Sequence, residues 1–272
     1  MATFIKGEAV ANATSYELLE KTDGNYKSIT EASAINFEVS AMGFEPGDHT
    51  LVVKAKATGY EDSDASNEVV YTVAEAEPEA VFNFDFATNN IDDYALSDIF
   101  TIPSGTDTST IEYDSTYGMT LAGQLKNGLN LVNPIDAGKA WTLEFTALFV
   151  TPTVLAGNRR AFLGGADLYP FVFINGTTYN QMGFQISNGN HATVYGKMKY
   201  DVEATYRIEH DGNSGVTVYV DDVQVGKVTV NFAGMFFTVI LGNVPGKSSA
   251  YVWDNVETGK KSYLHKMKFY YN

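Results

Sequence analysis

The side chains best suited to chemistry in this sequence are aromatic residues in loops, with amides and carboxylates beside them. Trp253 precedes Asp254 and Asn255, and Tyr179 precedes Asn180, in segments predicted to be loops. An aromatic ring stacks on the apolar face of a pyranose, while amides and carboxylates bind its hydroxyl groups. The alternative is that Trp253 and Tyr169 close the rim of a core, the commoner role of bulky aromatics. The predicted carbohydrate-binding residues are Tyr169, Tyr179, Asn180, Trp253, Asp254 and Asn255.

Hydrolysis of a glycan requires two carboxylates that flank the scissile bond, about 5 Å apart in a retaining enzyme. The sequence has no Glu-x-Asp-x-x-Glu motif, and its nearest acidic groupings, Asp221-Asp222 and Asp254 with Glu257, fall in predicted turns. It also lacks the Gly-x-Ser-x-Gly elbow of serine hydrolases and the Gly-x-x-x-x-Gly-Lys loop that binds phosphates. We therefore expect no enzymatic activity, and the alternative left open is a carboxylate pair from distant strands.

Composition and charge narrow the class of protein. The 272 residues include 24 glycines and 17 each of tyrosine and phenylalanine, which favours β-sheets over helices. There is no cysteine, so disulfides and thiolate metal sites are excluded. The formal net charge of −15 repels phosphate backbones and anionic lipids, so nucleic acid is not an expected partner. No export signal and no run of about 18 apolar residues is present, so membrane insertion is not expected either.

Two units joined by an acidic segment are predicted. Residues 1–80 contain 5 lysines, no arginine and 15 acidic residues, and so account for −10 of the net charge. The segment 74–80, AEAEPEA, offers little for a core to bury, and Pro78 disfavours a continuing strand. We therefore expect a module at residues 1–75, an acidic linker at 76–80 and a larger domain at 81–272.

Alternation of apolar and polar residues predicts half-buried strands in both units. In the first unit the pattern covers residues 35–40, 51–56 and 69–73. In the second unit, turn residues at 211–215 and 221–222 indicate two consecutive hairpins. We therefore expect an all-β chain, with the strands of the second unit at residues 81–86, 141–149, 182–186, 192–198, 206–210, 216–220, 237–241 and 263–271.

Residues 48–73, DHTLVVKAKATGYEDSDASNEVVYTV, resemble the last two strands of fibronectin type III and related bacterial immunoglobulin-like domains, and residues 13–18 resemble an earlier strand. The resemblance covers most of residues 4–73 and implies a small immunoglobulin-like sandwich. His49 stands where many such domains have a corner tyrosine, and too few residues precede Tyr16 to supply both opening strands. A sheet edge that is open to a partner is therefore expected in this module.

Residues 206–227, YRIEHDGNSGVTVYVDDVQVGK, resemble the signature of laminin-G and concanavalin A-like lectin sandwiches, with Asp222 in place of the hairpin glycine. Residues 141–145 resemble the early core strand of that family, and residues 264–271 resemble its closing strand. The resemblance covers roughly residues 81–272 and implies a larger jelly-roll (concanavalin A-like) sandwich. Laminin-G-type domains often hold one Ca²⁺ at the rim of the sandwich, so Asp167 and Asp254 are the weak candidates for metal ligands. No other cofactor is implied.

An immunoglobulin-like module followed by a lectin-like sandwich resembles the decoration, head-fibre and adhesin proteins of tailed bacteriophages. The resemblance implies a non-enzymatic protein of the virion surface. Residues 1–75 would contact other virion proteins, and residues 81–272 would bind glycans or the host cell surface; a homo-oligomer is left open. The alternatives are a secreted or cell-surface bacterial protein that binds or degrades carbohydrate, its signal peptide removed, and a structural module without a ligand.

Overall fold

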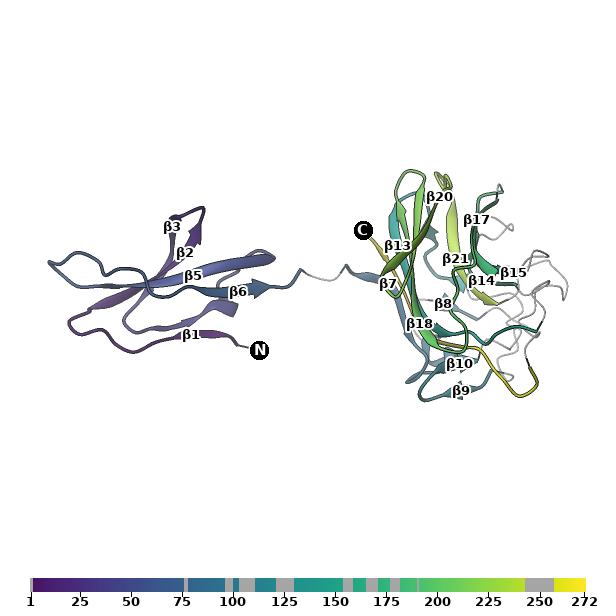
Figure 1. Ribbon diagram of the computed structural model, residues 1–272, viewed down its shortest axis with the longest axis horizontal. Helices are drawn as coiled ribbons and strands as arrows, with labels where there is room; N and C mark the ends of the chain where they lie inside the picture. Colours follow the sequence, from purple (N-terminus) through teal and green to yellow (C-terminus); the bar gives the residue numbers. More distant parts are fainter. Residues whose placement is uncertain are drawn as a thin grey trace. The chain divides into compact units, whose positions relative to one another are not determined.

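The computed structural model describes residues 2–75, 78–95, 100–102, 111–120, 130–153, 159–164, 171–176, 182–189, 191–242 and 257–272 (Figure 1). Apart from two short helical segments, the regular structure of these residues consists of β-strands. The predicted all-β sandwich class is therefore confirmed. The chain divides into two compact units, Met1–Glu77 (unit 1) and Pro78–Asn272 (unit 2). Among the described residues, no helix is long and apolar enough to cross a membrane.

Unit 1 consists of two antiparallel sheets. One sheet has four strands in the order β3 (Asn25–Ala32), β2 (Ser15–Thr22), β5 (Gly47–Lys56) and β6 (Val69–Val73). The other sheet, within the described residues, contains only β1 (Phe4–Lys6) and β4 (Asn36–Glu38). A sheet in this strand order that faces a second sheet is the arrangement of an immunoglobulin-like sandwich. Here the second sheet is reduced to two strands.

The core of unit 1 follows from the alternation along β2 and β5. Leu18 on β2 and Leu51 on β5 are fully buried, and Phe37 on β4 belongs to the same apolar cluster. The strand predicted at residues 35–40 is shorter in the structure, because Val39–Ala41 forms a 3₁₀ turn (η1). Gly43, whose φ is 67°, follows this turn. Val39 is still buried in the turn, so alternation alone did not show where the strand ends.

His49, near the start of β5, links three parts of unit 1. Its Nδ1 lies 2.6 Å from Oε1 of Glu20, its Nε2 lies 2.7 Å from the carbonyl oxygen of Glu45, and its ring lies 4.6 Å from the ring of Phe44. Both oxygens are acceptors, so both ring nitrogens donate at once only when the imidazole is protonated. The hydrogen bond to Glu20, and after it the bond to Glu45, raises the pKa of His49 above its ordinary value.

We therefore expect unit 1 to lose stability as the pH rises. Because the pKa of His49 is raised in the folded state, its stabilisation is complete below about pH 6.5 and is lost as the pH passes through the folded-state pKa. A charge-assisted hydrogen bond contributes about 1.5–3 kcal/mol, and partial exposure places the contribution of this one below that range. The expected loss in the free energy of unfolding is about 1 kcal/mol between about pH 5.5 and about pH 9.

The measurement is a urea titration of the full chain at both pH values, in which unfolding is monitored by the NMR signals of unit 1. The matched control is His49→Gln, which has no titrating ring. The difference in free energy between wild type and His49→Gln is expected to shrink at the higher pH. A difference that stays constant with pH would contradict the assignment of a charged His49.

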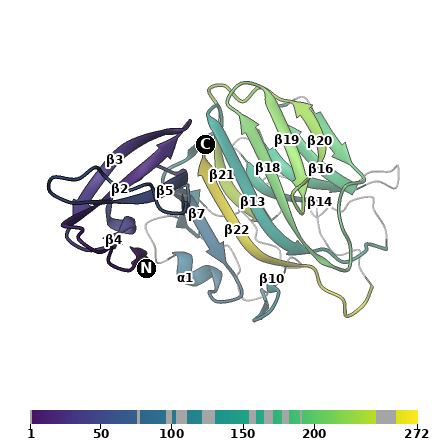
Figure 2. The same ribbon diagram turned by 60° about the vertical axis from the view of Figure 1, so that its left-hand side comes forward.

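Unit 2 is a sandwich of two antiparallel sheets (Figures 1 and 2). The first sheet has eight strands, in the order β20 (Val223–Thr229), β19 (Gly215–Val220), β18 (Glu203–Asp211), β13 (Ala140–Leu148), β22 (Tyr263–Tyr271), β10 (Gly118–Thr120) and β9 (Tyr113–Asp114), with β7 (Ala80–Asp85) also paired to β22. The second has six, in the order β12 (Ile135–Asp136), β21 (Phe236–Gly242), β14 (Arg159–Gly164), β15 (Phe171–Gly176), β16 (Met182–Ser187) and β17 (His191–Tyr195). A helix, α1 (Ile91–Ala95), and a separate strand pair, β8 (Phe100–Thr101) with β11 (Asn130–Leu131), complete the unit.

Aromatic side chains fill the space between the two sheets of unit 2. Phe145 on β13 lies 4.4 Å, between ring centroids, from Phe162 on β14, and Trp141 on β13 lies 5.6 Å from Phe237 on β21. All four side chains are at most 1% exposed. These contacts join the two sheets across the core and hold β13 in place. In Figure 2, β22 separates β13 from β7, the first strand of the unit.

The hairpins of unit 2 lie where the sequence predicted them. The turn between β18 and β19 is closed by Asp211, whose Oδ1 accepts the backbone N–H groups of residues 213, 214 and 215 at 2.8–3.0 Å. In the next turn Asp221 and Asp222 have φ values of 46° and 62°. Asp tolerates this left-handed region, which glycine usually occupies in such hairpins. The replacement of the hairpin glycine by Asp222 therefore leaves the hairpin intact.

One predicted strand of unit 2 is shorter than expected. Alternation extended it over residues 192–198, but β17 ends at Tyr195. Gly196 follows with a φ of 66°, a conformation that turns the chain out of the sheet. Met198 is nevertheless buried, so its apolar character matched the strand pattern without a strand being present.

Candidate functional site

The residues predicted to bind sugar lie outside the part of the chain that the structure describes. This holds for Tyr169, Tyr179, Asn180, Trp253, Asp254 and Asn255, and also for Asp167. These assignments therefore stay predictions. Within the described ranges, no group of three or more histidine, aspartate or glutamate side chains could hold a metal ion.

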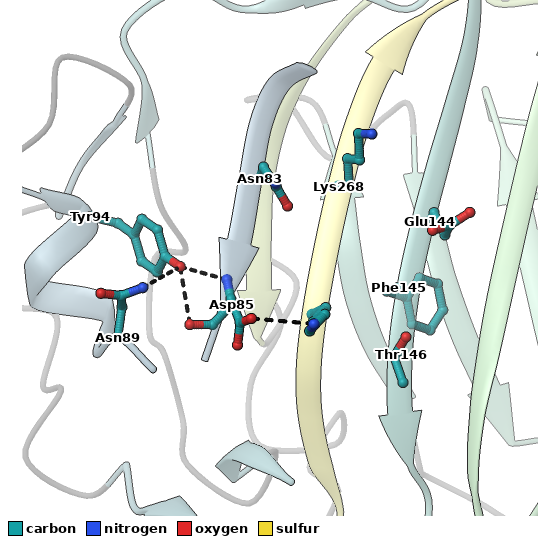
Figure 3. Close-up of a pocket in the computed structure, with 9 residues that line it drawn as sticks. Asn83, Asp85, Asn89, Tyr94, Glu144, Phe145, Thr146 and Lys268 are labelled. Atoms are coloured by element: carbon teal, nitrogen blue, oxygen red, sulfur yellow. Dashed lines mark hydrogen bonds and ion pairs between the residues drawn. The ribbon is translucent and has the colours of Figure 1, made fainter. Parts of the chain in front are cut away.

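A pocket of about 400 Å³ lies on the outer face of the eight-stranded sheet of unit 2 (Figure 3). Its floor is formed by β7, β22 and β13, whose inward side chains belong to the core and whose outward side chains at the pocket are polar. We call this pocket the trough. It is lined by Asn83, Asp85, Asn89, Tyr94, Glu144, Phe145, Thr146, Lys266 and Lys268.

The register of the three strands places Asn83, Lys268 and Glu144 side by side in one row. Asn83 on β7 is paired with Lys268 on β22, which is paired in turn with Glu144 on β13. Side chains at directly opposed positions have Cβ atoms about 4.5–5.5 Å apart. The side chains of Asn83 and Glu144 make no hydrogen bond or ion pair with another described residue. An amide and a carboxylate in this row are therefore free to bind a ligand.

A second row, two residues further along the strands, is already occupied by internal contacts. Asp85 forms an ion pair with Lys266, with Oδ2 and Nζ 3.3 Å apart. Thr146 shares a hydrogen bond of 3.1 Å with Thr205 on the neighbouring strand β18. These contacts fix side chains at one end of the trough. The Asn83 amide and the Glu144 carboxylate of the first row therefore lie next to side chains that are already held in place.

Tyr94 and Asn89 form the side of the trough beyond β7. The hydroxyl group of Tyr94 donates to the carbonyl oxygen of Asp85 at 3.1 Å and also contacts the side-chain amide of Asn89. The ring of Tyr94 packs against Phe84 at 4.8 Å and against Phe100 at 6.4 Å. The ring therefore packs against the core, and in Figure 3 its hydroxyl group points toward Asp85. Stacking of a sugar on this ring is not supported.

The two carboxylates of the trough do not form the pair that glycosidases use. Asp85 and Glu144 stand on strands separated by β22, and in different rows. Lys266 on that intervening strand neutralises Asp85 directly. A retaining enzyme needs two free carboxylates about 5 Å apart, and an inverting enzyme needs them about 6.5–9.5 Å apart with a water between them. The arrangement suits binding of hydroxyl groups better than acid catalysis.

Sequence analysis did not single out the trough residues. Alternation along residues 81–86, 141–149 and 263–271 indicates that Asn83, Glu144 and Lys268 point away from the core. It does not indicate that β22 lies between β7 and β13, because these strands are far apart in the chain. The pairing of the first and last strands of unit 2 is the fact that creates the site, and alternation carries no signal for it.

Comparisons with known proteins give only remote likenesses. No protein-family model matches the chain, and no curated protein sequence matches it. Among solved structures, the carbohydrate recognition domain of Emp46p, solved as a point mutant, is 13% identical with a TM-score of 0.48, covering 72% of this chain and 98% of that one. Domain 4 of AbnA, an extracellular arabinanase of Geobacillus stearothermophilus solved with arabinotriose, is 14% identical with a TM-score of 0.47, covering 72% and 94%.

The binding domain of botulinum neurotoxin serotype D is a third similar structure, 9% identical with a TM-score of 0.43. It is matched over 64% of this chain and 49% of its own length. Each of these TM-scores is below 0.5 and each identity is at most 14%. A ligand for this chain therefore has to be argued from its own residues.

Proposed function

We propose that the chain is a non-enzymatic glycan-binding protein and that the trough of unit 2 is its binding site. The observation that supports this most is the first row of the trough, where the Asn83 amide and the Glu144 carboxylate have no partner among the described residues. A pyranose presents neighbouring hydroxyl groups that donate and accept hydrogen bonds. Asn83 and Glu144 lie on strands separated by β22, so they would bind hydroxyl groups at opposite edges of a sugar, and a volume of about 400 Å³ is within the range of small-ligand pockets.

The first test is a glycan array probed with the full chain, followed by titration of the glycan that binds. We expect Glu144→Gln to weaken binding about tenfold, because a hydrogen bond to a charged group contributes about 1.5–3 kcal/mol. Asn83→Ala is expected to weaken binding by a smaller factor, since its amide is neutral. The matched control is Gln224→Ala, which removes an exposed amide from β20 of the same sheet and should leave the affinity unchanged.

Unchanged affinity in both Glu144→Gln and Asn83→Ala would contradict the trough as the site and would favour the residues predicted from the sequence, Trp253, Tyr169 and Tyr179. The proposal that the protein is not an enzyme is tested by a separate measurement. Incubation of the protein with the glycan it binds should release no reducing ends. Release that is lost on mutating Asp85 or Glu144 would show a hydrolase instead.

The protein that carries this site is, in our proposal, displayed on a virion, with unit 1 attaching it to the particle. Two features of unit 1 support an attachment role. β1 pairs with β4 only, so within the described residues its other edge is unpaired and open to strand addition. The strong acidity of residues 1–80 suits a basic receiving surface. Electron microscopy of virions labelled with an antibody against unit 2 tests this location, and label on the cell envelope alone would favour a secreted or cell-surface protein.

A further inference from the structure

A second pocket, of about 240 Å³, lies in unit 1 between the loops at residues 7–14 and 57–68. Val10 and Ala13 from the first loop, and Tyr60 and Glu61 from the second, line it together with Lys56 at the end of β5. This pocket is distinct from the trough of unit 2, which we propose as the glycan-binding site. We call it the loop pocket.

The second loop is held in place by serines that substitute for a β-strand along β5. The hydroxyl group of Ser63 accepts the N–H of Ala55, and that of Ser66 accepts the N–H of Val53, each at 2.9 Å. The backbone N–H groups of the same serines donate to the carbonyl oxygens of Ala55 and Val53, at 3.0 and 2.9 Å. The loop is therefore preorganised, so it loses little conformational entropy when a partner binds.

Tyr60 sits at the tip of this loop with 79% of its surface exposed, the largest value among the exposed large apolar and aromatic side chains of the described residues. Val10, on the facing loop, is 51% exposed. An exposed aromatic ring on a rigid loop is a favourable stacking surface, because few rotatable bonds have to be frozen on binding. The ring face therefore remains available to a partner.

The charge carried by the two loops around the loop pocket is negative. They contain Glu8, Glu61, Asp62, Asp64 and Glu68; Glu68 forms an ion pair with Lys21, and the other four carboxylates form none within the described part of the chain. Lys56, the one cation that lines the pocket, is already bound: its Nζ lies 3.0 Å from Glu17 and 3.5 Å from Glu31. A cationic group is the complement of this surface.

We propose that the loop pocket binds an arginine side chain of a partner protein, with the guanidinium stacked on Tyr60 and its N–H groups facing the carboxylate of Glu61. Arginine fits better than lysine because its planar guanidinium stacks on an aromatic ring and donates several hydrogen bonds at once. The inference rests on the attachment role proposed for unit 1, and it names the chemistry of the surface to which unit 1 binds.

The experiment is an NMR titration of the isotope-labelled full chain with the peptide acetyl-Gly-Arg-Gly-Arg-Gly-amide at about 150 mM salt, where long-range attraction is screened. Shifts are expected to concentrate at residues 10–13 and 55–63. The matched peptide has citrulline in place of arginine, which keeps the shape and removes the charge, and it should not bind. Tyr60→Ala should weaken binding of the arginine peptide about fivefold.

Tyr26→Ala is the control variant, because Tyr26 is also exposed (44%) but lies on β3, outside the loop pocket. It should bind the arginine peptide as the wild type does. Equal binding by Tyr60→Ala, equal binding of the citrulline peptide, or shifts spread over acidic loops of both units would overturn the inference. Glycan binding by unit 2 is measured in a separate experiment. A negative result for the arginine peptide therefore leaves the glycan-binding proposal standing, and the reverse also holds.

Discussion

Replacing Trp141 with alanine is expected to lower the free energy of unfolding of unit 2 by about 4 kcal/mol. The side chain is fully buried, and its ring lies between those of Phe237 and Phe269, each at 5.6 Å. Its Nε1–H donates to the carbonyl oxygen of Ala137 at 3.1 Å, and this acceptor would be left without a donor. The loss combines a large cavity with a broken buried hydrogen bond.

Denaturant unfolding followed by far-UV circular dichroism is the appropriate measurement, because the substitution removes one of only two tryptophans and so changes the fluorescence signal itself. Trp141→Phe is the matched variant: it keeps an aromatic ring between the sheets but loses the donor to Ala137 and part of the ring volume. We expect it to cost about half as much as the alanine variant. A change of less than about 1 kcal/mol in Trp141→Ala would show that the two sheets are not held together at this point.

Much of the fold could be predicted from the sequence because alternation reports directly on burial. Trp141 and Phe145 stood at alternate positions of a long strand, and the structure buries both. The turn at residues 211–215 was readable because Asp and Gly have local reasons to be there, which the hydrogen bonds of Asp211 make explicit. The misjudged strand ends, at Val39 and Gly196, are places where an apolar residue is buried without belonging to a strand.

The candidate sites were harder to predict, for a different reason. Aromatic residues beside amides, such as Trp253 with Asn255, can be found within one short segment. The trough requires three strands to be neighbours although Asn83, Glu144 and Lys268 are far apart in sequence. Tyr60 in the loop pocket was within a recognisable motif, but its exposure depends on the serines that hold the loop against β5. The trough is a product of strand pairing, and the loop pocket depends on serine hydrogen bonds to β5.

Packing and binding are linked through β13 and β22. Trp141 and Phe145 point from β13 into the core, and Glu144 points from the same strand into the trough. Met267 and Phe269 anchor β22 in the same way on either side of Lys268. Because the trough groups are positioned only by strand register, a change that displaces β22 should disturb the first row without altering any trough residue.

Gly118→Ala provides that change, and we expect it to lower the free energy of unfolding of unit 2 by about 3 kcal/mol. Gly118 on β10 has a φ of +85°, and a Cβ atom there would lie 2.4 Å from the carbonyl oxygen of Leu264 and 2.7 Å from Cα of His265. Both atoms belong to the backbone of β22, so the clash cannot be relieved by rotation of a side chain. Either β10 separates from β22 or β22 itself moves.

The matched control for Gly118→Ala is Gly259→Ala, because Gly259 has a φ of +86° and nothing within 4 Å of the added Cβ. It carries the same backbone strain without the clash and should cost about 1 kcal/mol. Thermal unfolding and glycan titration of both variants separate the two contributions. Gly118→Ala should lose both stability and affinity, since Lys266 and Lys268 follow directly on the displaced segment of β22, whereas Gly259→Ala should lose a little stability only. An equal loss in the free energy of unfolding in the two variants would mean that β22 tolerates the contact with the added Cβ. The trough would then depend less on strand register than the structure indicates.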